Sequence, residues 1–342
     1  MPKLKDVADV FDGYRLTEPW DETFAPPDKL RVTGEAPVLA QPVDPSVIDA
    51  TEWDLLSRGV RQRVRVLEAF LADVYGPGRA FDDGVVPWRL LYTSGRFRRE
   101  VVGFTPPSGV RCHVSVIDLV RDEQGQFRVL KDNVRVPSAV SRDEYPSRLL
   151  SALRAAAPHG VTGPFVVVLT PGVRGAASFE HALLARLMGV KLVEGSDLFC
   201  WRNRVYVRTA HGRRPVDVIY RGVDDDWLDP LQFRPESPFG CPGLVNAARA
   251  GNVTIANAIG NGVADDKLSY TYIPDLIRYY LGEEPLLENV DSSRLEDPDV
   301  LEKLAPRRIG LRMIAVNGCG DIWVLPGGAR KVTRKVARER DG

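Results

Sequence analysis

The pattern of apolar and polar positions predicts a chain of alternating helices and strands. Apolar side chains recur at helical spacing over residues 50–74, and the Tyr-Gly-Pro-Gly sequence at residues 75–78 predicts the end of that helix. Residues 165–169 form a short apolar run, which is followed by a Pro-Gly turn and by a helical pattern over residues 178–188. A strand, a loop and a helix in this order are typical of an open α/β sheet, in which ligands bind beyond the carboxyl ends of the strands.

Residues 112–133 predict a β-hairpin that carries polar side chains near its end. β-Branched and apolar residues flank a turn that ends in glycine. Asp118, Asp132 and Asn133 supply oxygen donors of the hard kind that magnesium prefers, and Lys131 lies among them. The hairpin is therefore a candidate metal site.

The remaining pattern predicts a helix over residues 147–157 and a second hairpin over residues 197–207. The first fifty residues are rich in proline and predict an arm with little secondary structure. The glycines near residue 260 are expected to follow a helix rich in Ala and Asn. They either let the backbone approach a ligand or simply end that helix.

Composition excludes several classes of function. Basic and acidic residues balance at 46 each, so no overall field recruits nucleic acid or an anionic membrane. No apolar run has the length of a membrane span, and the first residues lack the pattern of a signal peptide, so we expect a cytoplasmic protein. The four cysteines are widely spaced in sequence and predict reduced thiols rather than a zinc site or a disulfide framework.

Several motifs together resemble the circularly permuted ATP-grasp proteins related to glutathionylspermidine synthetase. They are the end of the hairpin with residues 133–138, the segments 98–104, 179–181 and 217–221, and the long stretch 250–285. The resemblance implies an α/β (mixed α+β), ATP-grasp-like, circularly permuted fold. It implies a ligase in which ATP phosphorylates a carboxylate and an amine displaces the phosphate, usually with two magnesium ions.

The chain departs from that family at positions near the nucleotide. The family has glutamate at the position of Lys131, and an ammonium group cannot ligate a metal. After residue 287 we find no glycine-rich phosphate loop, and Gly310 stands where much of the family has aspartate. These departures predict a truncated nucleotide-covering subdomain and a depleted ATP and magnesium site.

The resemblance also implies an organisation into four parts. They are an N-terminal arm (1–50), a helical lead-in with the metal hairpin (51–158), an α/β substrate domain (159–290), and a shortened C-terminal remnant with a basic tail (291–342).

Candidate site residues follow from the motifs and the resemblance. The catalytic candidates are Lys131 and Arg312, and the metal candidates are Asp118 and Asn133. The cofactor-binding candidates are Gly260, Asn261, Asp265 and Lys267. The substrate-binding candidates are Arg99, Arg174, Ser178, Glu180 and Arg221. The loop at residues 170–178 is expected to hold a small anion or a substrate carboxylate, because it precedes a helix N-terminus.

Two further features of the sequence lie outside these candidates. The acidic run at residues 224–226 is either a solvated turn or helix cap ahead of residues 227–228, or it anchors the following loop or touches substrate. His181 is expected to be structural.

Three functions remain open at this point. The first is a carboxylate–amine ligase that uses ATP and magnesium with a reduced metal site. The second is a degenerate relative without a cofactor that serves as a binding subunit for a partner enzyme. The third is an ATP-independent enzyme that uses the same cleft with Lys131 as an anion anchor or base. The expected substrate is a small amino-acid-like or peptide molecule.

Overall fold

The computed structural model describes residues 48–122, 124–137, 144–175 and 177–294. It also describes the backbone of four short strands outside these ranges, namely β1 (Phe24–Ala25), β2 (Lys29–Leu30), β13 (Leu311–Ala315) and β14 (Ile322–Pro326). The rest of the predicted arm and of the C-terminal remnant, with the basic tail, lies outside the described residues.

The chain divides into two units. Residues 58–118 and 129–286 form the larger unit, and residues 1–57, 119–128 and 287–342 form the smaller one. Residue 158, where the sequence predicts a domain boundary, lies inside the larger unit, and the organisation into four parts stays a prediction. In the smaller unit, β14 pairs antiparallel with β13 and with β12 (Ser293–Arg294).

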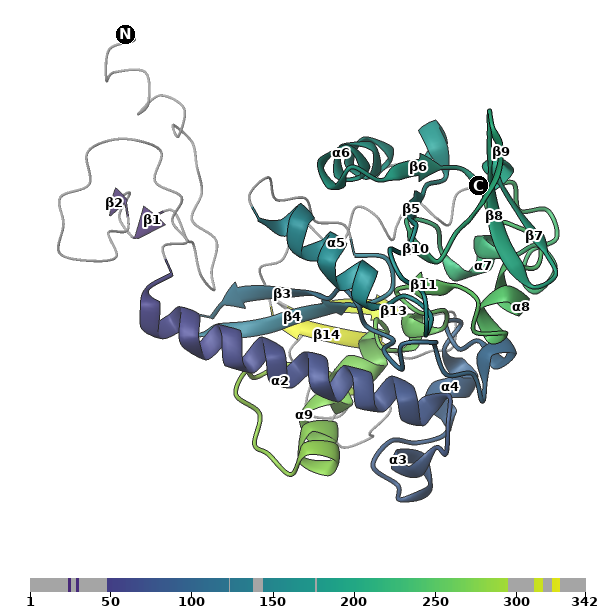
Figure 1. The fold of residues 1–342 in the computed structure, drawn as a ribbon. Coiled ribbons are helices and arrows are strands. Elements are labelled where there is room, and N and C mark those ends of the chain that lie inside the picture. The colour runs from purple at the N-terminus through teal and green to yellow at the C-terminus, as the bar shows by residue number, and fades with distance from the viewer. Residues whose placement is uncertain are drawn as a thin grey trace, which may run out of the picture. The chain divides into compact units, whose positions relative to one another are not determined.

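Helix α2 (Ala50–Val74) has the bounds that its apolar spacing predicts (Figure 1). Asp49 and Glu52 accept hydrogen bonds from each other's backbone N–H groups at the N-terminus, which is the arrangement of a capping box. Leu67, Phe70 and Leu71 are fully buried. After the helix come α3 (Arg79–Asp82), α4 (Arg89–Thr93) and the 3-10 turn η1 (Arg99–Val101).

The predicted metal hairpin forms as strands β3 (Val116–Arg121) and β4 (Phe127–Asn133). The Arg63 guanidinium donates to both carboxylate oxygens of Asp132 in β4, over 2.5 and 2.8 Å. Both side chains are only 1% exposed. Asp132 therefore fastens the end of the hairpin to α2 and is not a ligand candidate.

A four-stranded parallel sheet, in the order β11-β10-β5-β6, carries the α/β part (Figure 1). Its strands are β5 (Val166–Leu169), β6 (Lys191–Val193), β10 (Val218–Arg221) and β11 (Thr254–Ala256). All residues of β5 and β10 are buried, as expected for central parallel strands.

Helices α5 (Tyr145–Ala155) and α6 (Ser178–Met188) pack on this sheet. Leu149, Leu153, Leu184 and Met188 form a core with the apolar side chains of the strands. Pro146 stands in the first turn of α5, where its missing N–H costs nothing. The predicted strand–loop–helix unit is thus confirmed at residues 166–188.

An antiparallel sheet, β7 (Leu198–Trp201), β8 (Arg204–Thr209) and β9 (Gly212–Pro215), follows the short turn η3 (Gly195–Asp197). The remaining elements are η2 (Gly172–Arg174), α7 (Asp225–Leu228), α8 (Leu244–Arg249), η4 (Asn261–Val263) and α9 (Lys267–Leu281).

Contrary to the sequence prediction, the glycines near residue 260 do not directly follow a helix rich in Ala and Asn. Helix α8 ends at Arg249, and residues 254–256 form the parallel strand β11. This strand pairs with β10, so tertiary pairing outweighs the helical preference of alanine.

Candidate functional site

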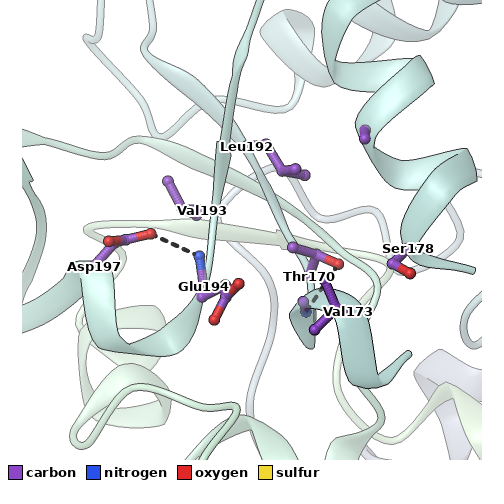
Figure 2. Close-up of a pocket in the computed structure, with 9 residues that line it drawn as sticks. Thr170, Val173, Ser178, Leu192, Val193, Glu194 and Asp197 are labelled. Atoms are coloured by element: carbon purple, nitrogen blue, oxygen red, sulfur yellow. Dashed lines mark hydrogen bonds between the residues drawn. The ribbon is translucent and has the colours of Figure 1, made fainter.

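A pocket of about 250 Å³ lies at the carboxyl ends of β5 and β6. Thr170 follows β5, Glu194 follows β6, and Ser178 begins helix α6. Figure 2 shows the carboxylates of Glu194 and Asp197 on one side and the hydroxyl groups of Thr170 and Ser178 on the other. This is the edge of the sheet at which the sequence predicts a ligand.

Two carboxylates line the pocket, contrary to the expectation of an anion site alone. The Asp197 carboxylate accepts a hydrogen bond from the Glu194 backbone N–H over 2.9 Å, and the Glu194 carboxylate accepts one from the backbone of Asp197. Both residues are exposed to solvent. This side of the pocket suits a cation or an amine, because carboxylates attract positive groups and repel a substrate carboxylate.

The opposite wall has the chemistry that the sequence predicts. No side chain caps the N-terminus of α6, where Ala177 occupies the N-cap position. The Ser178 hydroxyl donates to the Gly175 carbonyl over 2.7 Å and keeps its lone pairs as acceptors. A helix N-terminus favours negative charge. The pocket therefore presents opposite electrostatic preferences on its two sides.

Gly172 lets the two walls approach each other. It adopts a left-handed backbone with φ of 69°, and a methyl group there would lie 2.5 Å from Glu194 Oε1. Behind the wall, His181 Nδ1 lies 3.1 Å from the Thr170 hydroxyl oxygen. The imidazole packs so closely on Gly222 that a methyl group there would lie 2.1 Å from it. His181 is 7% exposed and burial lowers its pKa, which agrees with the expected structural role.

Other substrate-binding candidates lie outside the lining of this pocket. Arg174 and Glu180 are exposed on η2 and α6. The side chain of Arg99 is 88% exposed and lies 3.9 Å from Glu100. Their roles stay predictions.

Arg221 is buried and bound to the chain itself, which argues against its predicted substrate contact. Its side chain is 0% exposed and lies 2.6 Å from the Asp225 carboxylate. It also donates to the carbonyls of Asn257 and Ala258 over 2.8 and 3.0 Å. The sequence shows a cation at a strand end but not the backbone carbonyls that surround it.

The acidic run at residues 224–226 is not a solvated turn. Each carboxylate has a different arginine partner: Asp224 lies 3.3 Å from Arg135, Asp225 lies 2.6 Å from Arg221, and Asp226 lies 2.6 Å from Arg98. The run therefore joins three parts of the chain.

A cluster of charged residues lies where β4 meets the start of α9. The Lys267 ammonium donates to the Leu130 carbonyl over 2.6 Å. Burial first, and then the positive charge of Lys131, lower the pKa of Lys267 to about 8, while Asp132 and Asp118 act in the opposite direction. The fold thus brings together the candidates Lys131, Lys267 and Asp118, which lie far apart in the sequence.

Asp265 belongs to the same cluster. Its carboxylate accepts from the Val134 N–H over 2.6 Å and lies 3.6 Å from Arg135. Burial raises its pKa to about 6, against the effects of those two partners and of Lys131. The carboxylate therefore titrates nearer neutrality than an exposed aspartate.

Gly260 and Asn261 are buried and contact other parts of the chain, and their predicted binding of a cofactor stays a prediction. A methyl group on Gly260 would lie 2.5 Å from the Tyr75 ring, and the Tyr75 hydroxyl donates to the Gly260 carbonyl. Asn261 is 0% exposed and its amide nitrogen donates to the Arg111 and Val134 carbonyls. The close approach at Gly260 is therefore to the Tyr75 ring of the chain itself.

The metal candidates do not complete a protein-only site. Asp118 is exposed and Asn133 is half-buried on the hairpin. Across the described ranges, His, Cys, Asp and Glu side chains form no group of three or more that suits a metal ion. Arg312 lies in β13, where it pairs with Leu325, but its side chain lies outside the described residues.

Comparison with known proteins decides the family. A family model described as "A circularly permuted ATPgrasp" matches residues 45–142 and 140–341. The chain belongs to the circularly permuted ATP-grasp family. This confirms the resemblance at the level of the family, together with its mixed α/β fold and its ligase lineage.

The ATP-grasp relatives include proteins with and without a functional name. An uncharacterised protein of Mycobacterium leprae is 46% identical over an alignment of 376 residues, which covers 84% of this chain and 67% of that protein. An uncharacterised Synechocystis protein is 45% identical over an alignment that covers 77% of this chain and 61% of that protein. A Frankia casuarinae protein provisionally named glutamate–cysteine ligase 2-2 is 40% identical, over 87% of this chain and 38% of that protein.

In this ATP-grasp chain, no helix within the described ranges is both long enough and apolar enough to span a membrane.

Proposed function

We propose that the protein is an ATP-dependent ligase that joins the carboxylate of one substrate to the amine of another. The observation that carries this proposal is the half-buried Lys267, which donates to the Leu130 carbonyl beside Lys131 and whose pKa the Lys131 charge lowers, in a member of the ATP-grasp family. In such a reaction ATP transfers its terminal phosphoryl group to a carboxylate. The amine nitrogen then attacks the acyl carbon, phosphate leaves, and the nitrogen loses a proton.

The lysine cluster fits the phosphates of a nucleotide. An ammonium group has three donors and no acceptor, so Lys131 and Lys267 match anionic oxygens and not a metal ion. The Leu130 carbonyl holds the Lys267 ammonium next to the backbone of Lys131. These two side chains would bind the phosphates of ATP and offset the charge that develops during transfer.

Magnesium fits this cluster only in the company of phosphate. Asp118 and Asn133 supply oxygen donors on the hairpin, but they are too few for a site built from protein alone. Magnesium often keeps several waters and binds through one or two carboxylates and the phosphates of a substrate. Bound magnesium would supply further charge neutralisation, and Asp118 with Asn133 would contact it.

The pocket at Thr170 and Glu194 fits an amino-acid-like substrate. The ammonium group of such a molecule would face Glu194 and Asp197, and its carboxylate would face Ser178 at the N-terminus of α6. The volume of about 250 Å³ accommodates a small zwitterion. The name of the Frankia relative, a glutamate–cysteine ligase, supports the choice of an amino acid.

A second function, a binding subunit that no longer uses ATP, is favoured by residues that a relative has inside the matched span and that this chain lacks. The alignment with the Mycobacterium leprae protein extends over 376 residues, more than the 342 residues of this chain. The relative therefore carries residues inside the matched span that have no counterpart here.

Calorimetric titration with ATP distinguishes the two functions. We expect binding that requires magnesium in the native protein, and binding about tenfold weaker in Lys131→Gln, because one charge-assisted contact with phosphate is lost. Lys191→Gln, a change of the same chemistry at an exposed position on β6, is the matched control and should leave the affinity unchanged. Failure of the native protein to bind ATP would reject the ligase and favour the binding subunit.

A further inference from the structure

Two cysteines that are distant in sequence meet in the larger unit. Cys200 lies in β7 and Cys241 lies just before helix α8. Their sulfur atoms are 3.6 Å apart, and both thiols are free. The sequence gives no sign of this pair, because the two residues belong to no short motif.

The backbone around Cys241 keeps its sulfur close to β7. The Cys241 N–H donates to the Leu228 carbonyl over 2.9 Å. A methyl group on Gly240 would lie 2.2 Å from the same carbonyl oxygen, so the loop has no room to retreat. The buried Asp229 carboxylate accepts from the backbone N–H groups of Gly243 and Val245 over 3.1 and 2.9 Å.

The two thiols differ in access to solvent. Cys200 is partly exposed, whereas Cys241 is 0% exposed. The hydrogen bond from the Cys241 thiol lowers the pKa of Cys200. The same contact first, and then burial, raise the pKa of Cys241. A reagent in solution therefore meets Cys200 first, and Cys200 has the greater thiolate character.

We infer that Cys200 and Cys241 form a reversible disulfide by exchange with a low-molecular-mass disulfide. The Cys200 thiolate attacks one sulfur of the reagent, a mixed disulfide forms, and one reagent thiolate leaves. The Cys241 thiol then loses its proton and attacks Cys200 Sγ, which releases the second reagent thiolate. Two protein thiols are oxidised and one external disulfide is reduced to two thiols.

Closing the bond requires a small movement. A disulfide is about 2.05 Å long, so the sulfur atoms must approach by about 1.5 Å. Rotation of the partly exposed Cys200 side chain supplies this more easily than movement of the enclosed Cys241 loop. A neighbouring glycine leaves space for it, because a methyl group on Gly243 would lie 3.3 Å from Cys200 Cβ.

The disulfide would join two segments next to the pocket. Strand β7 begins directly after Asp197, which lines the pocket, and Gly195 packs against the loop of Cys241, where a methyl group would lie 2.3 Å from the Gly240 carbonyl oxygen. The bond would therefore fix the acidic wall relative to that loop. This restriction of the acidic wall does not depend on which molecule the pocket binds.

The test is mass spectrometry of the full chain after incubation with oxidised glutathione, alkylation of the remaining thiols and digestion without reduction. We expect a linked pair of peptides containing Cys200 and Cys241, which dithiothreitol separates. The unfolding temperature of the oxidised protein should rise by about 5–10 °C, because the bond restricts the unfolded chain.

Variants make the test specific. Cys241→Ser should stop at a glutathione adduct on Cys200, and Cys112→Ser, which removes a buried thiol outside the pair, should leave the linkage unchanged. The absence of linked peptides from the oxidised native protein, with Cys200 and Cys241 both alkylated, would overturn the proposal without any variant.

Discussion

The buried ion pair between Arg63 and Asp132 is expected to be a large single contribution to the stability of the hairpin. The two side chains are each 1% exposed, and two hydrogen bonds of 2.5 and 2.8 Å join them. Asp132→Asn keeps the shape of the side chain but leaves a buried guanidinium without its counter-charge. Loss of one partner of such a pair costs about 3–5 kcal/mol of unfolding free energy.

Urea unfolding followed by circular dichroism measures this loss. Glu144→Gln is the control, because it breaks an ion pair with Arg148 whose side chains are 73% and 79% exposed, and such pairs contribute about 0.3–0.5 kcal/mol. The double change Arg63→Met with Asp132→Leu should be less destabilising than Asp132→Asn, since it leaves no buried charge. If Asp132→Asn lost no more than the control, the reasoning about this pair would be refuted.

Two further predictions concern Gly260 and Asp265, which precede helix α9 in the chain. Gly260→Ala should lower the unfolding free energy by about 2–4 kcal/mol, because the new methyl group meets the Tyr75 ring at 2.5 Å. The control Gly251→Ala, at a glycine with a similar φ and open space around it, should cost about 1 kcal/mol. Thermal unfolding compares the two variants, and equal losses would contradict the packing argument. The pKa of Asp265 is raised from an ordinary 3.8 to about 6 in the folded protein. Between these two pH values the folded state therefore binds more protons than the unfolded state, and the stability of the protein falls as the pH rises from about 4 to about 6. Asp265→Asn should therefore gain up to about 3 kcal/mol relative to the native protein between pH 4 and pH 6, and a difference that does not change with pH would contradict the shift.

Local patterns predicted the regular elements of the fold well. The apolar spacing of α2 and of α6 predicted both helices at their observed bounds, because each buries one face and ends in a glycine-containing turn. Strand β11 was missed because three residues between two glycine-rich segments carry too little periodicity to be recognised. Its place is decided by pairing with β10.

The candidate site was predicted in part. The strand–loop–helix order located the pocket, and Ser178 lines it. The acidic wall was missed because Glu194 and Asp197 follow a different strand, and only the parallel pairing of β5 with β6 brings them to the pocket. The partners of buried charges, such as the carbonyls around Arg221, likewise depend on tertiary contacts that no local pattern records.

Protection of lysines from acylation tests the central claim most directly. The pKa of about 8 should make the half-buried Lys267 amine unusually reactive toward a limiting amount of acetic anhydride near neutral pH. Peptide mass spectrometry with and without ATP and magnesium would follow Lys131, Lys267 and the exposed control Lys191. We predict that the nucleotide slows acylation of Lys131 and Lys267 and leaves Lys191 unchanged. Calorimetric binding of ATP without protection of the first two lysines would contradict the placement of the phosphates at this cluster.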